Sequence, residues 1–245
     1  MIITQAVPMV APNLIQTSGL KGLWLSSDVA SADGTALASW PSQIDATGEL
    51  IQTTASAKST YRTNQLNGHG AVEFITDDFM TADGLAPLFA GSDMPFTLAM
   101  VSNAVISGTS IVANFGNTAD TNSFHYMGLS SGGLQTTARR GSTADTQTTL
   151  TGSGVTIGSR IRIWRFTGTA ASMLADNYAT LGTTALDKLA FSANQFTVGA
   201  FRRNLTIASF SNVRIFEMAL WNLALSDDEI AQLSNYWNQW YFARA

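Results

Sequence analysis

Carboxylates, histidines and nucleophilic hydroxyls are the side chains most able to do chemistry, and one hydrolase-like pattern occurs here. The segment Gly128–Gly132 matches the G-x-S-x-G turn that presents a catalytic serine in many hydrolases. That chemistry needs a histidine later in the chain, but His69 and His125 both precede Ser130. The two histidines are also too far apart for an HExxH metal motif. The pattern therefore predicts neither a serine hydrolase nor a zinc site.

Paired carboxylates would be needed for glycoside hydrolysis, at about 5–10 Å across the cleaved bond. Glu73 and Glu217 each stand alone in a strand-like segment, and we expect both on a strand face that contacts water. An acid pair would have to be assembled from distant segments, drawn from Glu73, Asp78, Asp176 and Glu217. We predict that the protein is not an enzyme and keep glycoside hydrolysis as the least favoured alternative.

Aspartates beside glycine-rich turns can bind calcium, and Asp77 and Asp78 are the candidates for this role. They lack the alternating oxygen ligands of an EF-hand loop, so capping of turns is their expected role. We predict no cofactor, with calcium at Asp77 and Asp78 as the alternative.

The composition excludes several classes of protein. Among 245 residues, 13 are basic and 17 acidic, and the net charge of −4 argues against nucleic-acid binding. There is no cysteine, which excludes disulfides and thiolate metal sites. The apolar N-terminus is broken by Pro8 and Pro12 and has no basic segment before it, so we expect neither a signal peptide nor a membrane span.

Short segments rich in Val, Ile, Thr, Phe and Trp, separated by Gly, Asn and Asp turns, predict an all-β fold. In Arg160–Ile163 the arginines and isoleucines alternate, which is typical of antiparallel sheets with one face in water. Turns recur every 8–14 residues or so, which favours a two-sheet jelly-roll sandwich. The predicted strands include Ala71–Ile75, Phe96–Val105, Ile111–Phe115, Phe124–Leu129, Ile161–Phe166, Ala171–Ala175, Phe196–Phe201 and Ser209–Leu223.

One α-helix is predicted over about residues 227–241. Ser226 and Glu229 form a capping box at its start. Ile230, Leu233, Trp237 and either Trp240 or Tyr241 then repeat at helical spacing, so this stripe should pack on the sandwich.

Residues 1–20 are predicted to form an extended N-terminal arm, because residues 1–17 are uncharged, apolar and interrupted by prolines. The arm either packs on its own domain, residues 21–245, or reaches a neighbouring subunit. The second alternative predicts a homo-oligomer.

Five segments, in order, resemble the laminin-G-like and concanavalin A-like jelly-roll family. They are Gly22–Asp28 (GLWLSSD), Ala38–Gln43 (ASWPSQ), Ser59–Phe74 with its LNGHGAVEF portion, Asp77–Met80 (DDFM), and Val213–Ala231. The resemblance covers almost the whole chain and implies a two-sheet antiparallel sandwich with a terminal helix. The family includes lectins, carbohydrate-binding modules and adhesive domains, together with glycosidases whose acids are not matched here.

Jelly rolls of this type are common in bacteriophage tail fibres and capsid-surface proteins. By that analogy we expect a non-enzymatic virion surface protein, made in the host cytoplasm, attached through its arm to virion structural proteins, with a host glycan as its ligand. The alternatives are a purely structural decoration protein and a secreted carbohydrate-binding lectin module. Candidate ligand-binding residues outside the expected core are Tyr61, His69, Asp78, His125, Tyr126, Tyr178 and Arg202.

Overall fold

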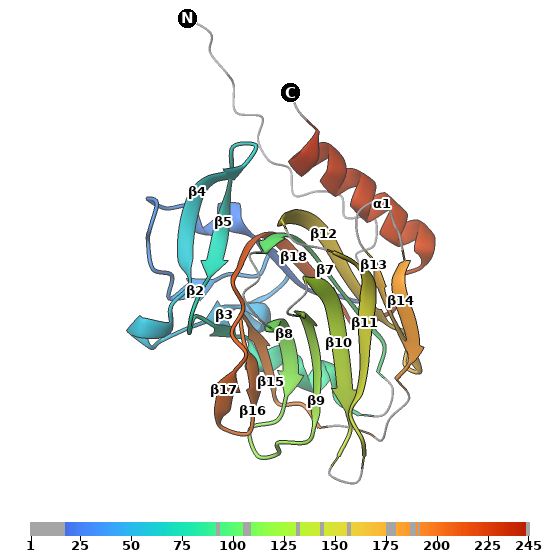
Figure 1. The fold of residues 1–245 in the computed structure, drawn as a ribbon. Helices are drawn as coiled ribbons and strands as arrows, with labels where there is room; N and C mark the ends of the chain where they lie inside the picture. The colour runs from blue at the N-terminus through green and yellow to red at the C-terminus, as the bar shows by residue number, and fades with distance from the viewer. Residues whose placement is uncertain are drawn as a thin grey trace, which may run out of the picture.

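Two antiparallel β-sheets lie face to face in the computed structural model and enclose the main hydrophobic core (Figure 1). The strand order is β14-β13-β12-β7-β18-β5-β4 in the first sheet, where β1 also pairs with β18, and β11-β10-β9-β8-β15-β6-β3-β2 in the second. The structure describes residues 18–91, 94–104, 109–130, 133–142, 145–155, 158–174, 180–186, 190 and 192–243. The predicted all-β jelly-roll sandwich is confirmed.

The strands of the first sheet are β1 (Leu20–Leu25), β4 (Thr60–Leu66), β5 (His69–Phe74), β7 (Phe96–Ala104), β12 (Gly158–Phe166), β13 (Ala170–Leu174), β14 (Thr180–Ala185) and β18 (Val213–Trp221). Those of the second sheet are β2 (Ser39–Trp40), β3 (Leu50–Ile51), β6 (Met80–Thr81), β8 (Ser110–Gly116), β9 (Phe124–Leu129), β10 (Leu134–Arg140), β11 (Thr148–Val155) and β15 (Gln195–Val198). A separate hairpin consists of β16 (Phe201–Arg203) and β17 (Thr206–Ala208).

Alternation along the strands of the second sheet separates its inner face from its outer face. Phe115, Met127 and Phe196 point into the core between the sheets and are fully buried. Burying side chains of this size contributes about 1.5–3 kcal/mol each. Their neighbours along each strand point to the outer face, where the β16–β17 hairpin lies.

The central strands of the first sheet, β7, β12 and β18, are buried on both faces, so the expectation of one face in water is wrong for them. Ile161 and Ile163 face the C-terminal helix, in a second hydrophobic cluster. Arg162, between them, is also fully buried, on the face toward the second sheet. Its guanidinium donates hydrogen bonds to the carbonyl and hydroxyl oxygens of Ser102 (2.7 and 2.8 Å) and to the carbonyl of Gly158 (3.0 Å). These bonds compensate part of the cost of burying a cation.

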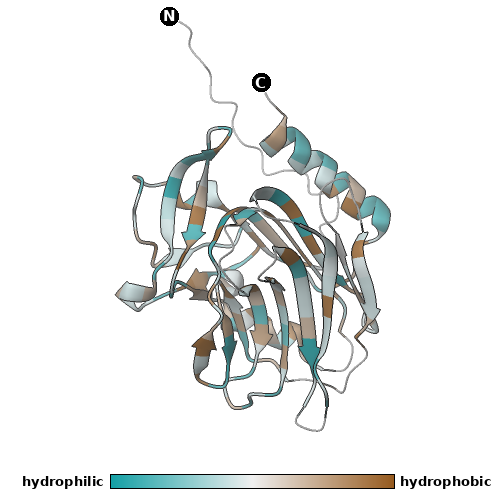
Figure 2. Cartoon of the chain, in the orientation of Figure 1, coloured by the Kyte–Doolittle hydropathy of each residue, from teal (hydrophilic) through white to brown (hydrophobic). Residues whose placement is uncertain are grey.

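The predicted C-terminal helix is confirmed as α1 (Asp227–Trp237), followed by one π-helical turn, Asn238–Phe242. The capping box is formed: Ser226 Oγ accepts from the Glu229 amide, and Glu229 Oε2 accepts from the Ser226 amide at 2.7 Å. Hydrophobic residues recur along α1 between hydrophilic ones (Figure 2), and its buried residues close the second cluster against the first sheet.

Four short 3-10 helices complete the described structure: Ser26–Val29, Ala46–Gly48, Ala55–Ala57 and Asp83–Phe89. Within the described part of the chain, no helix has the length and apolar character needed to cross a membrane. Residues 1–17 of the predicted arm lie outside the described residues, and β1 already begins at Leu20.

The segment Phe196–Phe201, predicted as one strand, is divided in two. Gly199 has a φ of +94°, which ends β15 and directs the chain into β16. This turn creates the hairpin on which the candidate site depends.

Candidate functional site

The β16–β17 hairpin lies against the outer face of the second sheet and is held there through its backbone. The carbonyl of Arg202 accepts hydrogen bonds from Asn114 Nδ2 (2.5 Å) and Gln195 Nε2 (3.2 Å). Gly116 makes this approach feasible, because a Cβ at that position would lie 2.4 Å from the same carbonyl. The hairpin is therefore fixed at one place on the sheet.

Aromatic contacts also hold the hairpin on the sheet. Phe201 packs edge-on against Phe124 and Tyr126, with ring centroids 5.1 and 5.6 Å apart. Such contacts add about 0.5–1.5 kcal/mol beyond the area that they bury. Tyr126 is half-buried as a result, and burial raises the pKa of its hydroxyl.

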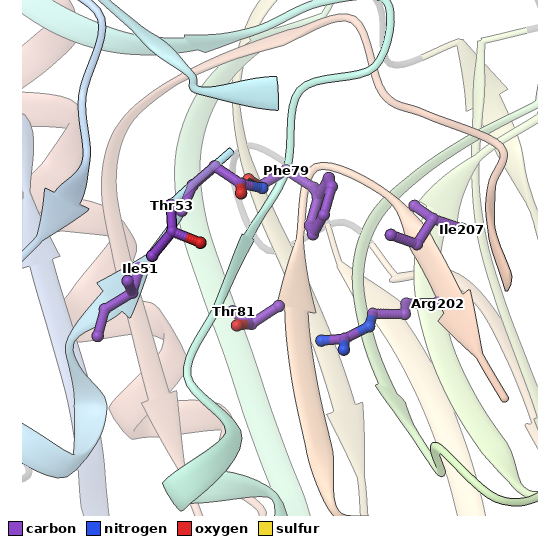
Figure 3. A pocket seen from close by; sticks show the side chains of 7 residues that line it. Ile51, Thr53, Phe79, Thr81, Arg202 and Ile207 are labelled. Carbon is purple, nitrogen blue, oxygen red and sulfur yellow. Dashed lines mark hydrogen bonds between the residues drawn. The ribbon is translucent and has the colours of Figure 1, made fainter. Parts of the chain in front are cut away.

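A pocket of about 260 Å³ opens between this hairpin and strands β3 and β6, and we call it the hairpin pocket. In Figure 3, Ile51 and Thr53 lie on one side, Arg202 and Ile207 of the hairpin on the other, and Phe79 and Thr81 between them. The lining residues are Ile51, Gln52, Thr53, Phe79, Thr81, Arg202 and Ile207. Apolar side chains with a few polar groups are typical of small-ligand sites.

A row of cross-strand neighbours runs from the pocket to the part of the second sheet that the β16–β17 hairpin covers. Each member faces its neighbour on the next strand, in the order Ile51, Thr81, Thr197, Asn114, Tyr126, Ala138 and Thr149. Thr197 Oγ1, Asn114 Oδ1 and the nearby Gln195 Oε1 are buried and have no hydrogen-bond partner among the described residues. Buried polar atoms of this kind require hydrogen-bond partners, which ordered water can supply, and none of these three residues lines the pocket.

The charge at the pocket comes from Arg202, whose guanidinium extends toward Thr81 in Figure 3. Asp83 Oδ2 lies 3.6 Å from the guanidinium, and the aspartate side chain is 45% exposed. Burial raises the pKa of Asp83, and the nearby Arg202 partly opposes that shift. A partly exposed pair at this distance contributes little stability, so a ligand carboxylate can compete for Arg202.

His125 is a correction to the predicted site, because it lies in the core between the sheets with 1% of its surface exposed. Its ring packs edge-on against Phe96 and Phe166, at 4.8 and 5.2 Å between centroids. Burial, together with the charge of Arg139, holds the pKa of His125 well below its usual value. It is a neutral core residue.

Tyr61 and Asp78, expected outside the core, are buried as well. Asp78 Oδ2 accepts from the Ile75 amide at 3.1 Å, which is the turn-capping role, and burial raises the pKa of this carboxyl to about 6. Asp77 beside it is exposed. In the described ranges no three His, Cys, Asp or Glu side chains are grouped so that they could hold a metal ion, so calcium at Asp77 and Asp78 stays a prediction.

The remaining candidates are divided between different places. Arg202 lines the hairpin pocket and Tyr126 lies under the hairpin, whereas His69 and Tyr61 line a second pocket beside the C-terminal turn. Tyr178 lies outside the described residues. Glu73 and Glu217 line neither pocket and are buried, which corrects their expected place on a wet face.

Thr81, Phe79 and Ile51 were not predicted as site residues. They belong to or adjoin strands of only two residues, and so short a segment carries no period-two signal.

Comparison with solved structures finds the same sandwich in sialidases and their binding modules. The CBM40 module of the Ruminococcus gnavus IT-sialidase, solved with α2,3-sialyllactose, matches with a TM-score of 0.54 and 16% identity, over 62% of this chain and 86% of that one. The NanB sialidase from Streptococcus pneumoniae has a TM-score of 0.55 and 13% identity, over 68% and 28%.

The Trypanosoma rangeli sialidase matches with a TM-score of 0.54 and 14% identity, over 94% of this chain and 34% of that one. No family model matches the sequence, and no curated protein does. The chain is thus a lectin-like jelly-roll β-sandwich. Identities this low show the fold and leave the ligand to be argued from the site.

Proposed function

We propose that this protein binds a glycan without cleaving it, and that the hairpin pocket is the binding site. The observation that carries the proposal is the lining of the pocket, in which the ring of Phe79 lies beside the hydroxyl group of Thr81 and the guanidinium of Arg202. Sugar hydroxyl groups can form hydrogen bonds with Thr81 and Arg202, and Phe79 offers an apolar surface to a sugar ring.

An acidic sugar fits the pocket best, because Arg202 is the cation among the described residues that line it. Guanidinium and carboxylate groups form strong charge-assisted hydrogen bonds. The CBM40 module with the same fold was solved with sialyllactose, which carries one carboxylate and many hydroxyls. We use 3′-sialyllactose as the probe for that reason.

Isothermal titration calorimetry with 3′-sialyllactose tests the site. Arg202→Met keeps the aliphatic stem but removes the charge, so affinity should fall about 10–100-fold, as expected for a lost charged hydrogen bond. Arg165→Met is the matched control, since Arg165 is also a partly exposed arginine paired with an exposed aspartate, Asp227, but belongs to the first sheet. Its affinity should be unchanged.

Three outcomes contradict the proposal. They are no saturable binding of the probe, wild-type affinity in Arg202→Met, and release of free sialic acid, which would show catalysis. Binding lost equally in both arginine variants would point to non-specific charge attraction instead.

Attachment to a virion surface through the N-terminal arm is the second part of the proposal and is supported by the sequence resemblance alone. If the arm clasps a neighbouring subunit, deletion of residues 1–17 should convert an oligomer into a folded monomer in light scattering. If the deletion instead unfolds the sandwich, as circular dichroism would show, the arm belongs to its own domain and this part of the proposal fails.

A further inference from the structure

A second pocket lies where the C-terminal turn meets the β4–β5 hairpin, on the first sheet, and we call it the C-terminal pocket. Its volume is about 260 Å³, and its walls include Ser27, Tyr61, His69, Gly70, Trp240 and Tyr241. None of these residues lines the hairpin pocket.

Two hydrogen bonds hold the pocket's walls together. Asn67 Nδ2 donates to the carbonyl of Tyr241 (2.7 Å), and His69 Nε2 donates to the carbonyl of Trp240 (3.2 Å). Carbonyls at the end of a helix lack helical partners, so the β4–β5 hairpin satisfies them and fixes the terminal turn.

The walls are largely aromatic. The ring of His69 lies 4.7 Å from that of Tyr241 and 5.6 Å from that of Trp240, between centroids. Trp240 is 40% exposed, whereas the other five tryptophans are at most 1% exposed. An indole open to solvent beside a recess offers an apolar platform to a ligand.

The pocket carries no net charge at neutral pH. Among the described residues that line it there is no lysine, arginine, aspartate or glutamate. Burial lowers the pKa of His69, so its imidazole is neutral at pH 7. Ser27 is exposed and provides a hydroxyl that can donate or accept. A charged ligand would lose hydration here without gaining a counter-charge.

We infer that the C-terminal pocket is a second saccharide site, which takes one uncharged pyranose ring stacked on Trp240 and hydrogen-bonded near Ser27. The volume lies just below the roughly 300–1,000 Å³ of pockets for drug-sized ligands, which suits one ring rather than an oligosaccharide. This inference does not depend on the hairpin pocket. If both sites act, the protein presents two unlike binding surfaces on opposite sheets.

Acrylamide quenching of tryptophan emission tests the inference, because acrylamide reaches exposed indoles and Trp240 is the exposed one. The probes are the methyl glycosides of glucose, galactose and mannose. At least one should protect Trp240 from quenching in a saturable way. Trp240→Phe should abolish the quenchable component and so verify the assignment.

Two variants measure the site by calorimetry with the protecting glycoside. Trp240→Ala should weaken binding about tenfold or more through loss of the stacking surface. Ser27→Phe, at an exposed position in the pocket lining, should block the recess. Leu205→Ala is the control, because Leu205 is 81% exposed on the β16–β17 hairpin and should not affect binding.

The inference is overturned if no glycoside protects Trp240, or if both Trp240→Ala and Ser27→Phe bind as the wild type does. Arg202→Met separates the two sites, because it should impair sialyllactose binding while leaving protection of Trp240 intact.

Discussion

Two buried glutamates on paired strands show how surroundings decide the charge of identical side chains. Glu73 lies between Arg62 Nε (2.6 Å) and Arg214 Nε (2.7 Å). Burial raises the pKa of Glu73, but the two arginines outweigh it and the net shift is downward. Glu217 has no arginine partner of this kind: it accepts a hydrogen bond from the Tyr241 hydroxyl at 2.9 Å, and burial raises its pKa to about 7.

Glu217→Gln should therefore change stability in a pH-dependent way. The native state holds the Glu217 proton up to about pH 7, while the unfolded chain releases it near pH 4.5, so the wild type loses stability as pH rises through this window. The loss amounts to roughly 3 kcal/mol. The glutamine variant avoids it, so urea unfolding should show higher stability than the wild type at pH 8 and little difference at pH 4.

Glu73→Gln is the control for which we expect the opposite effect on stability, because Arg62 and Arg214 would lose the carboxylate that they pair with. It should lower the free energy of unfolding at pH 8, where the wild-type carboxylate is ionised and paired. A Glu217→Gln variant that is likewise destabilised at pH 8 would mean that Glu217 is charged and well paired in the fold.

For single residues, the sequence predicted which side chains could bind a ligand better than it predicted where those side chains lie in the fold. Arg202 was recognised as a candidate because it follows a strand end, and it lines the hairpin pocket. His125 was misplaced, since residue type says nothing of which sheet face is inward. The helical spacing did not decide whether Trp240 or Tyr241 is the last residue of the buried stripe. The π-turn buries Tyr241 and leaves Trp240 exposed, and no capping or periodicity signal predicts such a turn.

Among the elements, the turn between β15 and β16 is the one that creates the hairpin pocket. Gly199 at φ +94° has Phe74 Cδ1 at 2.5 Å and the Asp78 carbonyl at 2.8 Å from the position of an added Cβ. The alternation of residue types does not predict a tight turn at Gly199, because Phe196–Phe201 has strand-like composition throughout. The sequence therefore predicted one strand where the structure has a strand, a tight turn and a hairpin.

Gly199→Ala should be strongly destabilising, by more than about 3 kcal/mol, because backbone strain and overpacking add. Gly68→Ala is the matched control: its φ is +89°, but an added Cβ meets nothing within 4 Å. Strain alone, about 1–2 kcal/mol, should remain there. Urea unfolding of both variants measures the difference, and equal losses would show that the crowding around Gly199 relaxes without cost.

For the whole molecule, period-two patterning and turn spacing were enough to predict the sandwich, and the capping box was enough to place α1. What they could not predict was which sheet the helix covers, and hence that the central strands of the first sheet are buried on both faces. The outer face of this sheet, with Ile161 and Ile163, is closed by a helix more than 60 residues later in the chain, and local patterns contain no such pairing. Arg162 between them is buried on the other face of the strand, against the second sheet.

The position of β18 has a consequence for the way the chain folds. This strand, Val213–Trp221, is the last in sequence, yet it pairs with β7, β5 and β1, whose residues were made more than 100 positions earlier. Contacts so distant in sequence give a high contact order, and proteins of that kind fold in milliseconds to seconds or more slowly. During synthesis, β7 and β5 stay without their central partner until β18, more than 100 residues further along the chain, has left the ribosome. We expect the first sheet to form only then, and its unpaired strand edges to need protection from aggregation until that point.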